Sequence, residues 1–218
     1  MLKANLGQAR TWICQHASTP WFVMTDSDAM ASRDWLEQLL QFRNSSKDDQ
    51  LGAVSCSPVE IQETTDAKLK KALKASSLQS NEYYSKTIKN PDRFGISLCL
   101  VKTEAARNFH TENPVLEDIL FGWHLNHQGW NHYSLSVPYY HKPLLSMENT
   151  LRRARIMGAW MRKIQYTTLY ALMFNSIRVP ISSPFGSKIQ NFKVYLNLIV
   201  GWFTHNRYTT DYKWTGSF

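Results

Sequence analysis

The sequence predicts an α/β fold, in which a mostly parallel sheet flanked by helices is followed by a helical tail. Two observations lead to this prediction. Short apolar runs rich in aromatic and β-branched residues alternate with segments whose apolar residues recur at helical spacing, as in strands connected by helices. After about Met147 the apolar residues are instead mixed with Arg and Lys over long stretches. We therefore expect an α/β domain over residues 1–147 and an amphipathic helical region over residues 148–218.

The first half of the chain has distinct helix and strand signals. Residues 3–17 have the pattern of a helix, and a Ser-Thr-Pro turn leads into a buried strand that begins at Trp21. Apolar residues at helical spacing predict a second helix around residues 35–40. The segments that follow are two expected strands, at residues 51–59 and 94–101, and a polar, Lys-rich, helix-prone stretch at residues 64–90.

The second half opens with a helix signal. Pro114 precedes a helix expected from Leu116 to about His127, and Gly129 is placed as its C-cap. Alternation over residues 130–137 predicts another strand. The tail is expected to form two amphipathic helices joined by a Pro-rich turn, at residues 150–178 and 188–208.

Composition limits the class of protein. With 43% hydrophobic and 19% charged residues, the chain is globular and not disordered as a whole. The net charge of +8 favours an anionic partner, either nucleotide phosphates, a phospholipid surface or nucleic acid. The three cysteines, Cys14, Cys56 and Cys99, lack metal-ligand spacing, so we expect reduced, buried thiols in a cytosolic setting. With neither a signal peptide nor a bilayer-length apolar run, the chain is expected to be soluble or to lie on a membrane.

Two carboxylates stand one residue apart where the first apolar run ends. On an extended backbone, Asp26 and Asp28 point to the same side. Carboxylates that converge at the carboxyl end of a buried strand repel each other and lose solvation, so they favour a divalent cation such as Mg²⁺ or Mn²⁺ that bridges phosphate oxygens. The alternative is that Asp28 caps the helix that follows, because Asp is a favoured N-cap residue.

A second acidic pair, Glu117 and Asp118, lies in the first turn of the helix after Pro114. The helix dipole stabilises a carboxylate there, which is the simpler explanation, whereas a role for Asp118 as a general base is the more specific one. The order of the motifs is more informative than either pair. An apolar strand, Asp-x-Asp, a helix and a strand precede the Glu-Asp helix, and His141 follows one strand later.

This order resembles the GT-A glycosyltransferases, in particular the large inverting family, glycosyltransferase family 2-like, that includes the processive polysaccharide synthases. The Asp-x-Asp motif alone has low specificity, whereas the composite with the Glu-Asp helix and the histidine is much more specific. The resemblance covers roughly residues 4–145. The matching segments are Asn5–Arg10, Thr25–Ala29, Asp34–Leu36, Leu116–Ile119 and Gly122–Leu125.

The resemblance implies a partial GT-A, Rossmann-like fold and the transfer of a sugar from a UDP- or GDP-linked donor to the hydroxyl of a glycan or lipid-linked acceptor. Asp28, with Asp26 nearby, would hold Mg²⁺ or Mn²⁺ against the diphosphate, where the metal acts as a Lewis acid. Asp26 would also face the ribose or the sugar. Asp118 would take the proton from the acceptor hydroxyl as it attacks the anomeric carbon, in one displacement that inverts the configuration.

Four further residues are assigned to the site through the resemblance. His141 resembles a third metal ligand, although a histidine satisfied by hydrogen bonds at a strand end is an equal alternative. Glu117 and Trp123 are assigned to substrate binding, with core packing as the simpler use of the tryptophan. Arg153 is expected to close over the diphosphate, unless its cluster is only a solvated helix face.

The chain departs from the family pattern at its start. Strand–helix–strand units that grip the nucleoside would precede residues 3–17, so we expect an N-terminally truncated domain, or a sheet completed by another chain. A sheet that lacks its first strands exposes an unpaired edge. In addition, residues 108–113 replace the Gly-Gly-Phe-Asp-like segment that shapes the acceptor site in the family.

Other interpretations remain open. The basic and aromatic tail helices suit either an anionic lipid surface, which would make the protein cytoplasmic and peripheral at the inner face of the membrane, or packing on the α/β domain. A truncated, non-catalytic remnant that binds metal or membrane is the main alternative to a transferase. A phosphohydrolase of the haloacid-dehalogenase type is disfavoured, because Ala29 and Met30 follow the second Asp where that class needs Thr or Val. No nucleic-acid recognition module is present, so nucleic acid is not expected as a partner.

Overall fold

A computed structural model of the chain describes residues 5–26, 29–60, 88–90, 94–141, 147–182 and 188–209. The chain divides into two compact units. We call the larger one the sheet unit and the other the helical unit. The sheet unit comprises Ala9–Thr111 and Glu117–Pro143, and the helical unit comprises Met1–Gln8, Glu112–Leu116 and Leu144–Phe218.

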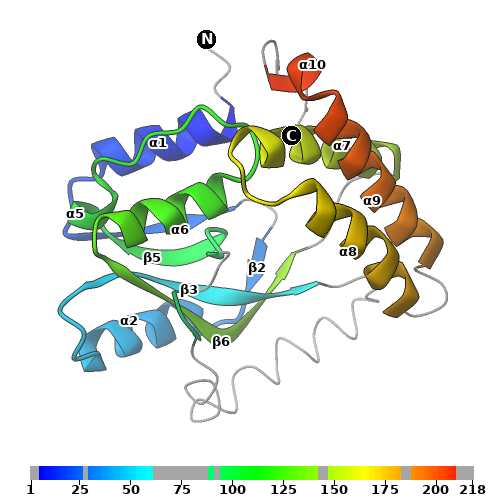
Figure 1. Cartoon of the computed structure of the whole chain (residues 1–218). Coiled ribbons are helices and arrows are strands. Elements are labelled where there is room, and N and C mark those ends of the chain that lie inside the picture. Colours follow the sequence, from blue (N-terminus) through cyan, green and yellow to red (C-terminus); the bar gives the residue numbers. More distant parts are fainter. Residues whose placement is uncertain are drawn as a thin grey trace. The chain divides into compact units, whose positions relative to one another are not determined.

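The sheet unit is built on one open sheet, with strand order β1-β5-β3-β6-β2 and with β4 also paired to β6 (Figure 1). Three predicted strands are confirmed, namely those that begin at Trp21 and those at residues 51–59 and 130–137. In the apolar run at 94–101, the strand begins only at Leu98. The strands are β1 (Trp21–Thr25), β2 (Ala29–Ala31), β3 (Leu51–Glu60), β4 (Ile88–Lys89), β5 (Leu98–Lys102) and β6 (Asn131–His141). Residues 61–87, which include most of the expected helix-prone stretch, lie outside the described part.

The prediction of a mostly parallel sheet is wrong. Among the described strands, only β3 and β6 pair in parallel, and the β1–β5, β3–β5, β2–β6 and β4–β6 pairs are antiparallel. β5 lies between β1 and β3 and is antiparallel to both. The hydrophobic pattern of the sequence located this strand, but such a pattern does not indicate the direction of a strand. As a consequence β1, β3 and β6 share one direction, and their carboxyl ends meet the amino ends of β5 and β2 at one end of the sheet.

Helices cover both faces of the sheet, and alternation along the strands assigns each residue to a face. Cys99 and Val101 of β5 face one core, whereas Leu98 and Leu100 face the other. The helices of the first face are α1 (Leu6–His16), α5 (Thr103–Ala106) and α6 (Glu117–His127), and α2 (Trp35–Ser45) covers the second.

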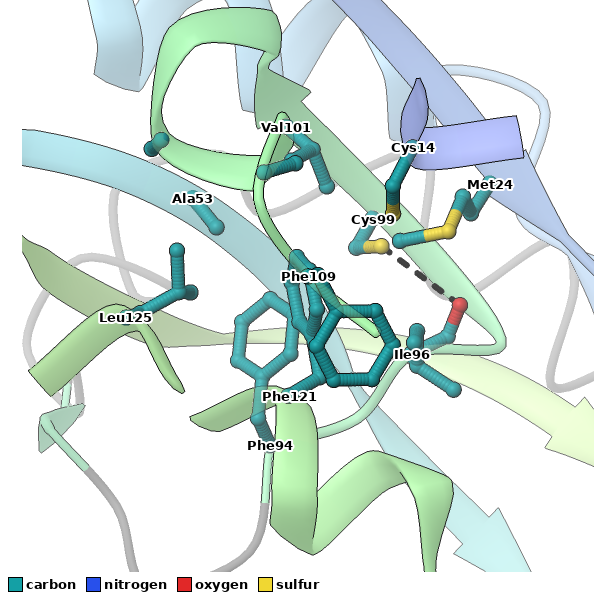
Figure 2. Packing of buried hydrophobic residues seen from close by; sticks show 12 residues of the cluster. Cys14, Met24, Ala53, Phe94, Ile96, Cys99, Val101, Phe109, Phe121 and Leu125 are labelled. Atoms are coloured by element: carbon teal, nitrogen blue, oxygen red, sulfur yellow. Dashed lines mark hydrogen bonds between the residues drawn. The ribbon is translucent and has the colours of Figure 1, made fainter. Parts of the chain in front are cut away.

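The core under α1 and α6 contains a cluster of aromatic rings and sulfur atoms (Figure 2). The rings of Phe109 and Phe121 meet edge to face with centroids 5.0 Å apart. The predicted burial of the thiols is confirmed, because all three cysteines are buried and free. Burial raises the pKa of Cys14 and of Cys99 to about 12, although the charge of Arg10 opposes the shift in both. These thiols therefore remain protonated and unreactive at neutral pH.

Helix boundaries in the sheet unit follow local signals. α6 ends in a Schellman motif, in which Gly129 has φ 78° and Trp130 N donates to Leu125 O at 2.9 Å, so the predicted C-cap is confirmed. α2 begins at Trp35, so Asp34 occupies its N-cap position, although the Asp34 side chain makes no capping hydrogen bond. The alternative that Asp28 caps this helix is therefore wrong.

The helical unit contains more helices than expected. The predicted helix at 150–178 is interrupted, because Gln165 adopts φ 54° and Tyr166 N donates to Met161 O at 2.9 Å, a Schellman end without glycine. The hydroxyl of Thr168 then accepts a bond from Ala171 N at 3.1 Å and starts the next helix. The helices are α7 (Met147–Lys163), α8 (Leu169–Ser182), α9 (Lys188–Phe203) and α10 (His205–Thr209).

α7 and α9 pack at unusually close range. A Cβ atom on Gly158 of α7 would overlap the backbone of Leu198, and one on Gly201 of α9 would overlap the backbone of Arg155. The side chain of Arg155 donates a hydrogen bond to Asn197 across the same contact. Within the described ranges, every helix is too short or too polar to cross a bilayer.

Candidate functional site

Four of the positions relevant to the predicted site converge at the sheet end where β1, β3 and β6 finish. Asp26 follows β1, Ser97 precedes β5, Ala29 opens β2 and His141 ends β6. In open α/β sheets, ligands bind in the crevice outside the carboxyl ends of the strands. This sheet end is therefore the candidate site.

Asp26 is held by two side chains. The guanidinium of the buried Arg10, on α1, forms an ion pair with one carboxylate oxygen of Asp26. The hydroxyl of Ser97 donates a 2.6 Å hydrogen bond to the other oxygen, and Asp26 N donates to Ser97 O at 2.9 Å. The carboxylate is thus fixed in one orientation, and its charge is already balanced by a cation of the protein.

His141 lies opposite the residue that follows Asp28. The antiparallel register of β2 and β6 pairs Ala29 with His141. Residues directly opposite in such a pair have Cα atoms about 4.5–5.5 Å apart. Ser27, Asp28 and the side chain of His141 lie outside what the structure describes, so the predicted metal ligation by Asp28 and His141 is untested. Among the side chains that are described, no three His, Cys, Asp or Glu residues gather as a metal site.

The second acidic pair opens α6, as expected. Glu117 is buried, whereas Asp118 is partly exposed and accepts a 3.0 Å hydrogen bond from Ile119 N. The residue before them, Leu116, has φ 63°, a left-handed conformation that costs a residue with a side chain about 1–2 kcal/mol. Strained backbone of this kind concentrates at functional sites. A partly exposed carboxylate at a helix start suits a group that exchanges protons with a substrate.

α1 holds both acidic segments through adjacent residues. Arg10 binds Asp26, and Thr11 exchanges two hydrogen bonds with Thr111. Thr11 Oγ1 donates to Thr111 O at 2.9 Å and accepts from Thr111 N at 2.8 Å. Thr111 begins the segment of chain that leads to Glu117. One turn of α1 therefore fixes the end of β1 and the approach to α6 together.

The two remaining predicted residues, Trp123 and Arg153, belong to different units of the chain. Trp123 is half-buried on α6 of the sheet unit. Trp130, which directly follows Gly129 after α6, packs on the core and has the Lys102 ammonium 4.2 Å from its ring centroid. Arg153 is exposed on α7 of the helical unit, and its role at the diphosphate stays a prediction.

Sequence reasoning missed the partners of Asp26. Arg10 lies inside the matching segment Asn5–Arg10, so a signal for it existed. Ser97 has no local signal, because it reaches Asp26 only through the antiparallel pairing of β1 with β5. In comparisons with known proteins, no family model matches this chain, and a search of curated proteins returns no match.

Proposed function

We propose that this chain carries the donor site of a metal-dependent inverting glycosyltransferase, located at the sheet end around Asp26. The observation that carries the proposal is the register of β2 on β6. It sets the backbone of His141 against that of Ala29, one residue from Asp28 and three from Asp26. If the Asp28 carboxylate and the His141 imidazole both turn toward this sheet end, they would form a donor set suited to a divalent first-row cation such as Mn²⁺.

The proposed roles divide between the two aspartates of the motif. Asp28 and His141 would hold Mg²⁺ or Mn²⁺, which supplies a Lewis acid for the leaving nucleoside diphosphate. The charge of Asp26 is already balanced by Arg10, so its carboxylate is better suited to accept a hydrogen bond from a hydroxyl of the donor ribose or sugar than to bind the metal ion. Asp118 accepts the proton of the acceptor hydroxyl, a contribution typically worth ~10²–10⁴-fold in rate. Glu117, Trp123 and Arg153 complete the proposed substrate contacts.

The proposal is tested by titrating the full chain with UDP and with GDP, each with and without Mn²⁺, in a calorimeter. We expect Mn²⁺-dependent binding of one nucleotide, lost in Asp28→Asn and weakened in His141→Ala. Asp49→Asn, which changes an exposed aspartate on the loop before β3, is the matched control and should bind as the parent does. Nucleotide-sugar turnover should disappear in Asp118→Asn while binding persists. Equal binding by the parent and Asp28→Asn, or none by the parent, would refute the proposal.

A further inference from the structure

The helical unit exposes two apolar stripes, one on α8 and one on α9. Their members recur at helical spacing, so each set lies on one face of its helix. Each of these side chains is between 38% and 81% exposed. The residues are Tyr170, Met173, Phe174 and Ile177 on α8, and Ile189, Phe192, Leu196, Val200 and Phe203 on α9.

These stripes are not the faces that hold the helical unit together. On the helical wheel, Leu172 of α8 and Leu198 of α9 lie opposite the stripes, and both are buried in one cluster with Ala154 of α7. Each stripe exposes on the order of 500 Å² of apolar side chain, near the upper end of the roughly 300–600 Å² that the largest, often functional, patch on a typical soluble monomer covers. Such a surface indicates a partner.

The charge of the chain identifies the chemistry of that partner. Residues 144–218 contain ten Lys and Arg and two Asp and Glu, whereas residues 1–143 contain fifteen of each, so the whole net charge of +8 belongs to the tail. α8 and α9 contain no acidic residue. Arg178 adjoins the α8 stripe, and Lys188 and Lys193 flank the α9 stripe on its two sides. Long basic side chains beside an apolar face are typical of a helix at an anionic membrane surface.

We propose that α8 and α9 bind the surface of an anionic phospholipid bilayer, with their apolar stripes inserted at the boundary between headgroups and acyl chains. With 14 and 16 residues, the helices are about 21 and 24 Å long, shorter than the ~30 Å hydrocarbon core, so they lie in the plane of the membrane. A second copy of the chain is less suited to cover the two stripes, because its binding would bring two basic surfaces together. The inference is independent of sugar transfer.

The test is co-sedimentation of the full chain with vesicles of phosphatidylcholine, with or without a minority of phosphatidylglycerol. We expect binding to the anionic vesicles that falls as NaCl rises, because surface charges are screened. Phe192→Ser should weaken the partition coefficient by about tenfold, since an aromatic side chain no longer leaves water. Trp12→Ser is the matched control, because Trp12 is a 62% exposed aromatic on α1, outside both stripes, and its loss should change nothing.

A charge variant separates the two contributions. Lys188→Glu with Lys193→Glu leaves the stripe intact and should abolish the preference for anionic vesicles. Circular dichroism should be unchanged in every variant, because the substituted side chains are not buried. Equal binding to neutral and anionic vesicles, or an unchanged partition of Phe192→Ser, would overturn the proposal. A dimer seen by light scattering, broken by Phe192→Ser without vesicle binding by the parent, would assign the face to self-association instead.

Discussion

The ion pair between Arg10 and Asp26 gives a quantitative test of how the sheet end is built. Arg10→Met keeps most of the side-chain volume and removes the cation. Breaking a buried pair from one side costs about 3–5 kcal/mol, and we expect about 2–3 kcal/mol here because the Asp26 side chain is 25% exposed and keeps its bond from Ser97. Asp26→Asn leaves a guanidinium in a side chain that is only 4% exposed, so its expected cost is higher, about 3–4 kcal/mol.

The assay is urea unfolding of the parent, both single variants and the double variant. Each single substitution leaves a charged partner without compensation, whereas the double substitution removes both charges. The double variant should therefore lose at least about 2 kcal/mol less than the sum of the singles. Ser97→Ala, which removes one hydrogen bond to the same carboxylate, should cost about 1.5 kcal/mol. Additive single effects, or single effects below about 0.5 kcal/mol, would show that the pair does not organise this sheet end.

Three other predictions concern the surrounding structure. Asp48→Asn should lower the free energy of unfolding by about 2 kcal/mol, because Tyr133 Oη (2.6 Å) and other donors lose a charged acceptor. Burial alone would raise the pKa of Asp48, but its hydrogen bonds and the charge of Lys89 lower this pKa below the ordinary value of 3.8. The stabilisation by the Asp48 carboxylate is therefore fully present above pH 3.8 and is lost as the pH falls through the pKa of the folded state. The variant should therefore show a shallower acid limb in thermal melts than the parent, and identical limbs would contradict this. Gly158→Leu should destabilise the helical unit by at least about 1–3 kcal/mol, seen in chemical denaturation, since its side chain meets the backbone of α9. An unchanged midpoint would show that α7 and α9 can separate freely. All three thiols should resist a thiol reagent in the native state and react in urea, and rapid native labelling would disprove their burial.

Local signals in the sequence predicted much of the fold. The C-cap at Gly129, the helix predicted from Leu116 and observed from Glu117, and the strand that begins at Trp21 each depend on residues close together in the chain. Once the strands are located, the alternation of side chains along each strand assigns its residues to the two faces of the sheet.

The features that the sequence did not predict depend on contacts between distant residues. Hydrophobic periodicity gives no strand direction, so the reversed β5 was missed. β2 has only the residues Ala29–Ala31, too few for a pattern, and exists because β6 pairs with it. The end of α7 was missed because Gln165, and not a glycine, adopts the left-handed conformation there.

The candidate site likewise combines features that local sequence predicts with features that depend on distant contacts. The acidic pairs could be located from the sequence, because each follows or opens a recognisable element. Their support could not, because the contacts of Asp26 with Arg10 and Ser97 span 16 and 71 residues of chain. Ala29 and His141 are still further apart in sequence, and their pairing is the contact on which the proposed donor site rests.

The most direct test of the proposed donor site is the anomalous scattering of Mn²⁺ in crystals of the full chain grown with Mn²⁺ and the nucleoside diphosphate that binds. The proposal predicts one strong peak at the end of β1, coordinated by the side chains of Asp28 and His141 and by the diphosphate, with the Asp118 carboxylate facing the same end of the sheet. A peak away from this sheet end, or Asp118 turned to a different face of the sheet unit, would contradict it.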